Sequence, residues 1–196
     1  MDSDSSPSIE VAVGNCAWRA AVTDPEIICR HAAAATLRSA EPGLGAGLAG
    51  RLQGQIEVSI RLTDDAEMRR LNRTYRGQDK PTNVLSFEGD DPASAGGPGE
   101  PWLLGDVVLA FETVAGEASM EGRPLEAHLA HLVVHGVLHL LGHDHEDEAE
   151  ASTMEALESR IVMGLGFADP HDADAHDADP DGGLGPLAVL AAEAVR

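Results

Sequence analysis

The sequence contains few aromatic residues and few basic ones. Of its 196 residues only 3% are Phe, Trp or Tyr, and 13 Lys and Arg stand against 34 Asp and Glu, a formal net charge of −21. The core must therefore be built mainly from Leu, Val, Ile and Ala. A molecule of this charge repels phosphate at long range, which excludes a nucleic-acid binder that relies on net charge unless its cations are gathered in one place.

The sequence also contains only two cysteines and no long apolar run. Cys16 and Cys29 form no C-x-x-C motif, which favours small buried thiols in a reducing compartment over a disulfide framework. No run approaches the ~18 apolar residues of a membrane span, and the acidic N-terminus lacks the apolar segment of a secretory signal. We therefore expect a soluble, cytoplasmic protein that makes no membrane contact.

The chain length favours one domain with appendages. We expect a flexible leader over residues 1–8, a domain over residues 9–168 and an acidic low-complexity tail over residues 169–196. The tail repeats short units of His, Asp and Ala, a composition typical of solvated chain. Disorder is favoured there over weak metal scavenging by His171 and His176.

The hydrophobic pattern predicts an α+β fold, a small mixed sheet of about four strands flanked by helices. The firmest strand covers residues 55–62, where apolar and polar residues alternate. Asp64 and Glu67 have capping-box spacing, so a helix should begin there and end near Gly77. The other expected strands are 9–13, 83–87 and 103–111, the last interrupted at Gly105 and Asp106, and the other expected helices are 24–37, 124–141 and 148–165.

Nearly half of the cations lie within residues 61–80. Six Lys and Arg stand there against four Asp and Glu, a local balance of 6 − 4 = +2. On charge alone, a solvated helix face is favoured over a binding surface. The residues that could contact a polyanion are Arg69, Arg70, Arg73, Arg76 and Lys80.

The most informative stretch is a histidine motif, H-x3-H-x2-G-x2-H, at residues 135–145. On one helix, His135 and His139 are one turn apart and place both imidazoles on the same face. Gly142 can end that helix in a left-handed conformation, and the turned chain can return His145 to the same ion. Three imidazoles leave a fourth position for water, which is typical of a catalytic zinc. We predict one Zn²⁺ at the end of this helix.

Other histidines leave alternatives open. His143 is an alternative third ligand, although it lies directly after Gly142. His131 is one turn before His135 and could compete with the proposed ligands. We expect His128 and His131 to face solvent or to support the ligands from outside.

The same spacing occurs in the metzincin proteases, but Gly136 replaces the glutamate that follows the first histidine in them. In a zinc protease that glutamate takes a proton from the attacking water, and glycine cannot. Peptidase activity is therefore disfavoured. Asp144 could accept the proton or orient a ligand, and its position next to His145 favours neither role over the other.

Three blocks together resemble the YbeY family of bacterial rRNA maturation factors, which are described as zinc-dependent single-strand endoribonucleases. The blocks are HGVLHLLGHDH at 135–145, LNRTYRGQDKPTNVLSF at 71–87 and LGDVV at 104–108. The resemblance covers about residues 9–167 and leaves out the segment 89–100 and the tail. It implies that His135, His139 and His145 bind zinc and that Arg76 acts in the cleft. From spacing alone, Arg76 is equally well explained as a cation at a helix C-terminus.

We therefore expect a zinc-dependent endoribonuclease that cleaves single-stranded rRNA in rRNA maturation and ribosome quality control. Metal-activated water would attack, with Arg76 and Asp144 as catalytic residues. The expected partners are rRNA and a ribosomal subunit or its assembly proteins. A non-catalytic, zinc-stabilised ribosome-assembly factor is the main alternative. A peptidase with Asp144 as base is the least favoured alternative.

Overall fold

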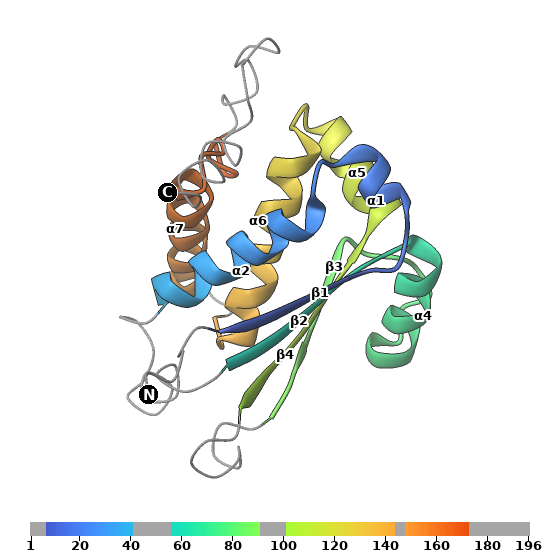
Figure 1. Cartoon of the computed structure of the whole chain (residues 1–196), viewed down its shortest axis with the longest axis horizontal. Coiled ribbons are helices and arrows are strands. Elements are labelled where there is room, and N and C mark those ends of the chain that lie inside the picture. The colour runs from blue at the N-terminus through green and yellow to red at the C-terminus, as the bar shows by residue number, and fades with distance from the viewer. Residues whose placement is uncertain (1–6, 41–55, 91–100, 144–147, 173–196) are drawn as a thin grey trace.

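The computed structural model describes residues 7–40, 56–90, 101–143 and 148–172 (Figure 1). It confirms the α+β class and the four expected strands. Helices α1 and α5 were not predicted. In chain order the elements are β1 (Ser8–Val13), α1 (Ala17–Ala21), α2 (Pro25–Ala40), β2 (Ile56–Thr63), α4 (Asp65–Arg76), β3 (Val84–Glu88), β4 (Trp102–Ala110), α5 (Phe111–Met120), α6 (Leu125–Leu140) and α7 (Glu148–Gly164).

The four strands form one mixed sheet in the order β1-β2-β4-β3. β1 and β2 are parallel, as are β2 and β4, whereas the edge strand β3 is antiparallel to β4. The predicted interruption of the last strand is wrong, because β4 runs through it with a shift in register: Glu57 pairs with Leu103 and Val58 with Gly105. Gly105 adopts a φ of 145°, a conformation that favours glycine.

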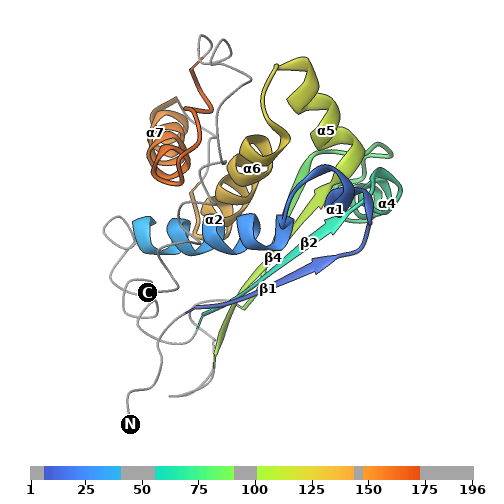
Figure 2. The same cartoon turned by 45° about the horizontal axis from the view of Figure 1, so that its top comes forward.

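Helices cover the two faces of the sheet unequally. α2 and α6 pack on one face, with α7 beyond them, and α4 packs on the other face (Figures 1 and 2). Alternation along β4 divides its side chains between the two faces. Val107 and Leu109 belong to the large core under α2 and α6, and Val108 joins Met68 and Leu85 in a small core under α4.

Helix α4 begins and ends as its sequence predicts. The Asp64 side chain accepts a hydrogen bond from the backbone N–H of Glu67 at 2.8 Å. This bond satisfies one of the helix's free N–H groups. Gly77 caps the other end in the left-handed conformation at φ 70°, as glycine commonly does. The direction of Arg76 is thus set by a well-defined helix end.

The two cysteines are both free thiols. Cys29 is buried on α2, and burial raises the pKa of its thiol to about 12. Cys16 is exposed, so the prediction that both thiols are buried is wrong for this residue. It precedes the short helix α1, which was not predicted.

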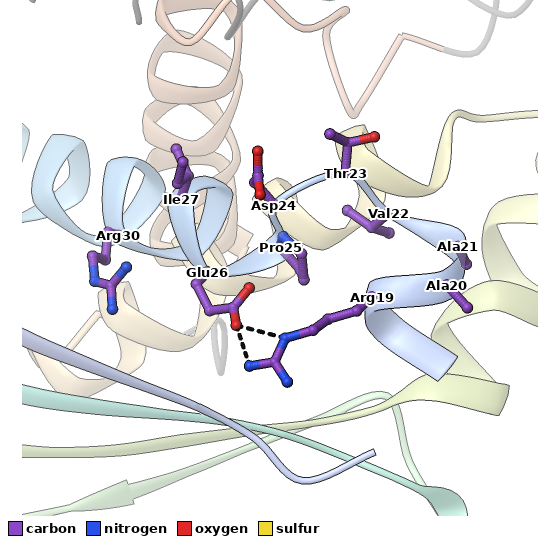
Figure 3. Close-up of a pocket in the computed structure, with 10 residues that line it drawn as sticks. All are labelled: Arg19, Ala20, Ala21, Val22, Thr23, Asp24, Pro25, Glu26, Ile27 and Arg30. Atoms are coloured by element: carbon purple, nitrogen blue, oxygen red, sulfur yellow. Dashed lines mark hydrogen bonds and ion pairs between the residues drawn. The ribbon is translucent and has the colours of Figure 1, made fainter. Parts of the chain in front are cut away.

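The corner between α1 and α2 forms a cavity of about 610 Å³ (Figure 3). Arg19 of α1 donates from Nε to a carboxylate oxygen of Glu26 on α2 at 2.9 Å. This ion pair spans the cavity wall and uses the guanidinium of Arg19.

In the described parts of the chain, no helix is both long and apolar enough to cross a membrane.

Candidate metal centre and cleft

Helix α6 carries the first two histidines of the motif. Ten of its sixteen residues are buried, so the helix is held firmly between the sheet and α7. His135 and His139 are half-buried, and their Nε2 atoms lie 3.1 Å apart. Two ring nitrogens this close either share a hydrogen bond or serve as adjacent ligands of one ion. The structure therefore brings this predicted pair together.

The C-terminal end of α6 is formed by Gly142. Its φ is 83°, and its N–H donates to the carbonyl of His139 at 2.9 Å, so the predicted glycine stop is confirmed. Asp144 and His145 lie outside the described residues. Their predicted roles as catalytic residue and third ligand stay predictions.

His143, the alternative third ligand, lies beside the pair. It lines the same cavity as His135 and His139. Its Nε2 is buried and has no hydrogen-bond partner within the part of the chain that the structure describes. Burial lowers the pKa of His143, which favours the neutral ring that a metal requires.

The histidines open onto a cavity of about 530 Å³ beside edge strand β3. Arg76, from the end of α4, lines this cavity together with His135 and His139. Ser86 of β3 also lines it, and its hydroxyl donates to the carbonyl of Gly136 at 3.0 Å. The guanidinium of Arg76 from α4 and the two imidazoles from α6 therefore line the same cavity.

The other predicted RNA contacts on α4 lie elsewhere. Arg69 pairs with Asp79 at 2.8 Å, Arg73 approaches the same carboxylate at 4.0 Å, and Arg70 lies 3.6 Å from Glu67. These three arginines line a separate cavity of about 380 Å³. No carboxylate of the described residues pairs with Arg76 or Lys80. The predicted basic set thus divides into three paired arginines, Arg76 in the cleft, and Lys80, which follows the helix and does not line this cleft.

Glu158 of α7 is the carboxylate behind the histidines, and the sequence analysis did not identify it. It is 2% exposed, and its Oε1 lies 2.7 Å from His135 Nδ1. Burial raises the pKa of Glu158, but hydrogen bonds with His131 and His135 outweigh it and hold this pKa well below its usual range. A carboxylate at Nδ1 places the ring proton there and makes Nε2 the nitrogen that can bind a metal.

The second oxygen of Glu158 meets two further histidines. Its Oε2 lies 3.1 Å from His131 Nε2 and 2.7 Å from His171 Nε2. The three donor atoms all lie within 4.8 Å of one another, and the group could hold a metal ion. His171, which we assigned to the tail, thus contacts the folded domain.

The expectation that His128 could face solvent is wrong. His128 is 5% exposed, and its Nε2 lies 3.0 Å from Oε2 of Glu117. His131 is half-buried, and its Nε2 contacts Glu158, the carboxylate that also meets His135.

Gly136 explains why the metzincin glutamate has no place here. A Cβ added at this position would lie 2.6 Å from Cγ1 of Val107 on β4. The face of α6 at Gly136 therefore rests directly on the sheet, against Val107 and Ser86. A longer side chain at this position would collide with the core before it could reach the histidines.

Known proteins with sequences similar to this chain are endoribonucleases by name. A family model described as Endoribonuclease YbeY matches residues 45–166. The Endoribonuclease YbeY of Paramagnetospirillum magneticum is 50% identical over 167 residues, covering 84% of this chain and 96% of that protein. The protein of the same name from Rhodopseudomonas palustris strain HaA2 is 45% identical, covering 87% of this chain and 85% of its own length.

Among solved structures, the chain is similar to the solution structure of TM1509 from Thermotoga maritima. The TM-score is 0.49 at 21% identity, covering 89% of this chain and 99% of that one. The family model spans more than half of the chain, and the two relatives span most of it. This chain therefore belongs to the YbeY endoribonuclease family.

Proposed function

We propose that this chain is a zinc-dependent endoribonuclease that cleaves single-stranded rRNA during rRNA maturation and ribosome quality control in the cytoplasm. Its partners would be rRNA and a ribosomal subunit or its assembly proteins. The relatives' shared name supports the reaction class. One observation carries the proposal: the Nε2 atoms of His135 and His139 lie 3.1 Å apart in a cavity that Arg76 also lines.

The donor set fits a divalent zinc ion. His135 and His139 offer two ring nitrogens, and Glu158 fixes the tautomer of His135 from behind. His145 would complete the set, with His143 as the alternative. When bound, zinc lowers the pKa of water and polarises phosphoryl oxygens. The protein's own part is to orient the imidazoles so that they converge, which the buried carboxylate and the packed helix accomplish.

Arg76 would bind the phosphodiester. A guanidinium offers a planar fork of donors that matches phosphate oxygens. Because no described carboxylate competes for it, Arg76 can donate these bonds to the substrate as charge develops there. Arg69, Arg70, Arg73 and Lys80 would contact the RNA backbone farther from the cleft. Asp144 stays the proposed proton acceptor.

A preference for single strands has one supporting feature at the end of α4, outside the lining of the cleft. Tyr75, which precedes Arg76, is 66% exposed and packs edge to face on Phe87 at 4.9 Å between ring centroids. An exposed ring can stack on an unpaired base, which a base inside a duplex cannot reach. Tyr75 is thus a candidate base platform next to the phosphate-binding arginine.

Cleavage of an unstructured RNA by the purified full chain tests the proposal. His139→Ala and zinc removal by a chelator should each abolish turnover. Zinc added back should restore the turnover of the chelator-treated native protein. Arg76→Ala should lower kcat by about 100- to 1,000-fold, the usual effect of one lost transition-state donor. Arg73→Ala is its matched partner on the same helix, and it should raise KM with little change in kcat.

Three outcomes would contradict the proposal. Unchanged cleavage after His139→Ala or after complete zinc removal would show that the histidines do not support the chemistry. A protein that unfolds without zinc and never cleaves RNA with it would be the zinc-stabilised assembly factor instead. Hydrolysis of peptides without RNA cleavage would indicate the peptidase.

A further inference from the structure

A second group of metal donors lies behind the cleft, formed by His131 of α6, Glu158 of α7 and His171 after α7. We propose that these three residues bind a second divalent cation of the first transition series, distinct from the ion assigned to His135 and His139. Both imidazoles contribute Nε2 and the carboxylate contributes Oε2, and the donor atoms lie within 4.8 Å of one another.

His171 is held in place by its own segment. Ser159 of α7 donates its hydroxyl to Oδ1 of Asp169 at 2.7 Å, and the same oxygen accepts the backbone N–H of His171 at 3.0 Å. The chain after α7 is thereby fastened to the helix, and His171 reaches Glu158. The third donor is therefore positioned by a local hydrogen-bond network.

The chemistry of the donors selects the kind of ion. Two imidazoles and one carboxylate suit Zn²⁺ and its transition-metal neighbours, whereas Mg²⁺ and Ca²⁺ favour all-oxygen sites. His171 is 31% exposed at its side chain, which leaves solvent access for waters that complete the coordination. An adjoining cavity of about 340 Å³, lined in part by His131 and Pro170, gives a further approach.

The second ion should bind more weakly than the first. His135 has Glu158 at its outer nitrogen, whereas Nδ1 of His131 has no hydrogen-bond partner among the described residues. Such an outer partner typically changes metal affinity by about 10- to 100-fold. We expect the second dissociation constant to be larger by this factor.

Zinc counting on the full chain tests the proposal. The native protein and four variants would be dialysed against a series of buffered Zn²⁺ concentrations, and bound zinc would be measured by mass spectrometry. The native chain should bind two ions in two steps. His171→Ala should lose the weaker step and keep the tighter one, and His171→Asn should do the same. Circular dichroism would confirm that each variant is folded.

His176→Ala is the matched control, because it removes the other tail histidine and leaves the proposed donors intact. It should retain both ions. The proposal is overturned if the native chain binds one ion that His171→Ala keeps, if His171→Ala still binds two, or if His176→Ala loses the weaker ion.

His139→Ala separates this proposal from the proposed function. If His139→Ala loses the tighter ion and His171→Ala the weaker, both proposals are supported. If His171→Ala loses an ion while His139→Ala keeps every ion, the site behind the cleft is supported and the zinc-dependent nuclease is contradicted.

Discussion

Helices α4 and α6 lie on opposite faces of the sheet and end at the same cavity, but they hold their polar residues in different ways. The arginines of α4 are exposed, and Glu67 or Asp79 pairs with three of them. The histidines of α6 stand on a helix with ten buried residues, and His131 and His135 contact the buried carboxylate of Glu158. Arg76 differs from the other arginines of α4 because it lies at the end of the helix, where it lines the cavity. His135 is positioned instead by the packing of its helix and by its contact with Glu158.

The largest expected effect tests the support behind α6. Glu158→Gln keeps the shape of the side chain but removes its charge, so it should weaken zinc binding at the His135 site by about 10- to 100-fold. Glu155→Gln, exposed on the same helix, should leave the affinity unchanged. Competitive titration with a zinc indicator measures both. Equal affinities in the two variants would refute the role of Glu158.

The next effect tests the packing of α6 on the sheet. Gly136→Ala places a methyl group 2.6 Å from Val107 Cγ1, and it should lower the free energy of unfolding by about 1–3 kcal/mol. Gly116→Ala in α5 meets no atom within 4 Å and should raise it by up to about 1 kcal/mol. Urea denaturation measures both changes. A stabilised Gly136→Ala protein would contradict this packing.

A smaller effect tests the start of α4. Asp64→Ala removes the oxygen that accepts the Glu67 N–H, and it should lower the free energy of unfolding by about 1 kcal/mol. Asp64→Asn keeps an acceptor and should recover most of the loss. Thermal melting compares the three proteins. If alanine and asparagine behave alike, the cap contributes nothing to stability.

The smallest expected effect concerns pH. A hydrogen bond from Thr63 is the largest cause and lowers the pKa of Glu67 from 4.5; burial raises this pKa by less, and a hydrogen bond from Arg61 lowers it further. A depressed carboxyl pKa stabilises the fold above pH 4.5, and this contribution is lost as the pH falls through the folded pKa. Glu67→Gln should therefore reduce the stability difference between pH 7 and pH 4, by under about 1 kcal/mol. Urea denaturation at the two pH values measures this difference. If Glu67→Gln leaves it unchanged, the contacts of Glu67 with Thr63 and Arg61 do not stabilise the fold.

The sequence predicted the elements whose signals are local. β2 follows from strict alternation, and α4 follows from Asp64 and Gly77 at its two ends. Helix α5 was missed because it begins at Phe111, directly after β4, and its N-cap residue Ala110 provides no side-chain cap. A helix without a cap signal is not separable from the strand before it by pattern alone.

The candidate site was predictable only in part, for the same reason. The spacing of His135 and His139 is a property of one helix, so the sequence alone predicts their convergence. Glu158 stands among other acidic residues of α7, and only tertiary packing sets it apart by burying it against three imidazoles. The pairing of Arg69 with Asp79 also depends on the fold beyond the helix.

Anomalous diffraction at the zinc edge, on crystals of the full chain grown with zinc, tests the central claim most directly. We expect an ion about 2.0–2.1 Å from Nε2 of both His135 and His139, in the cavity that Arg76 lines. Crystals that bind zinc elsewhere while these two rings coordinate nothing would contradict the account.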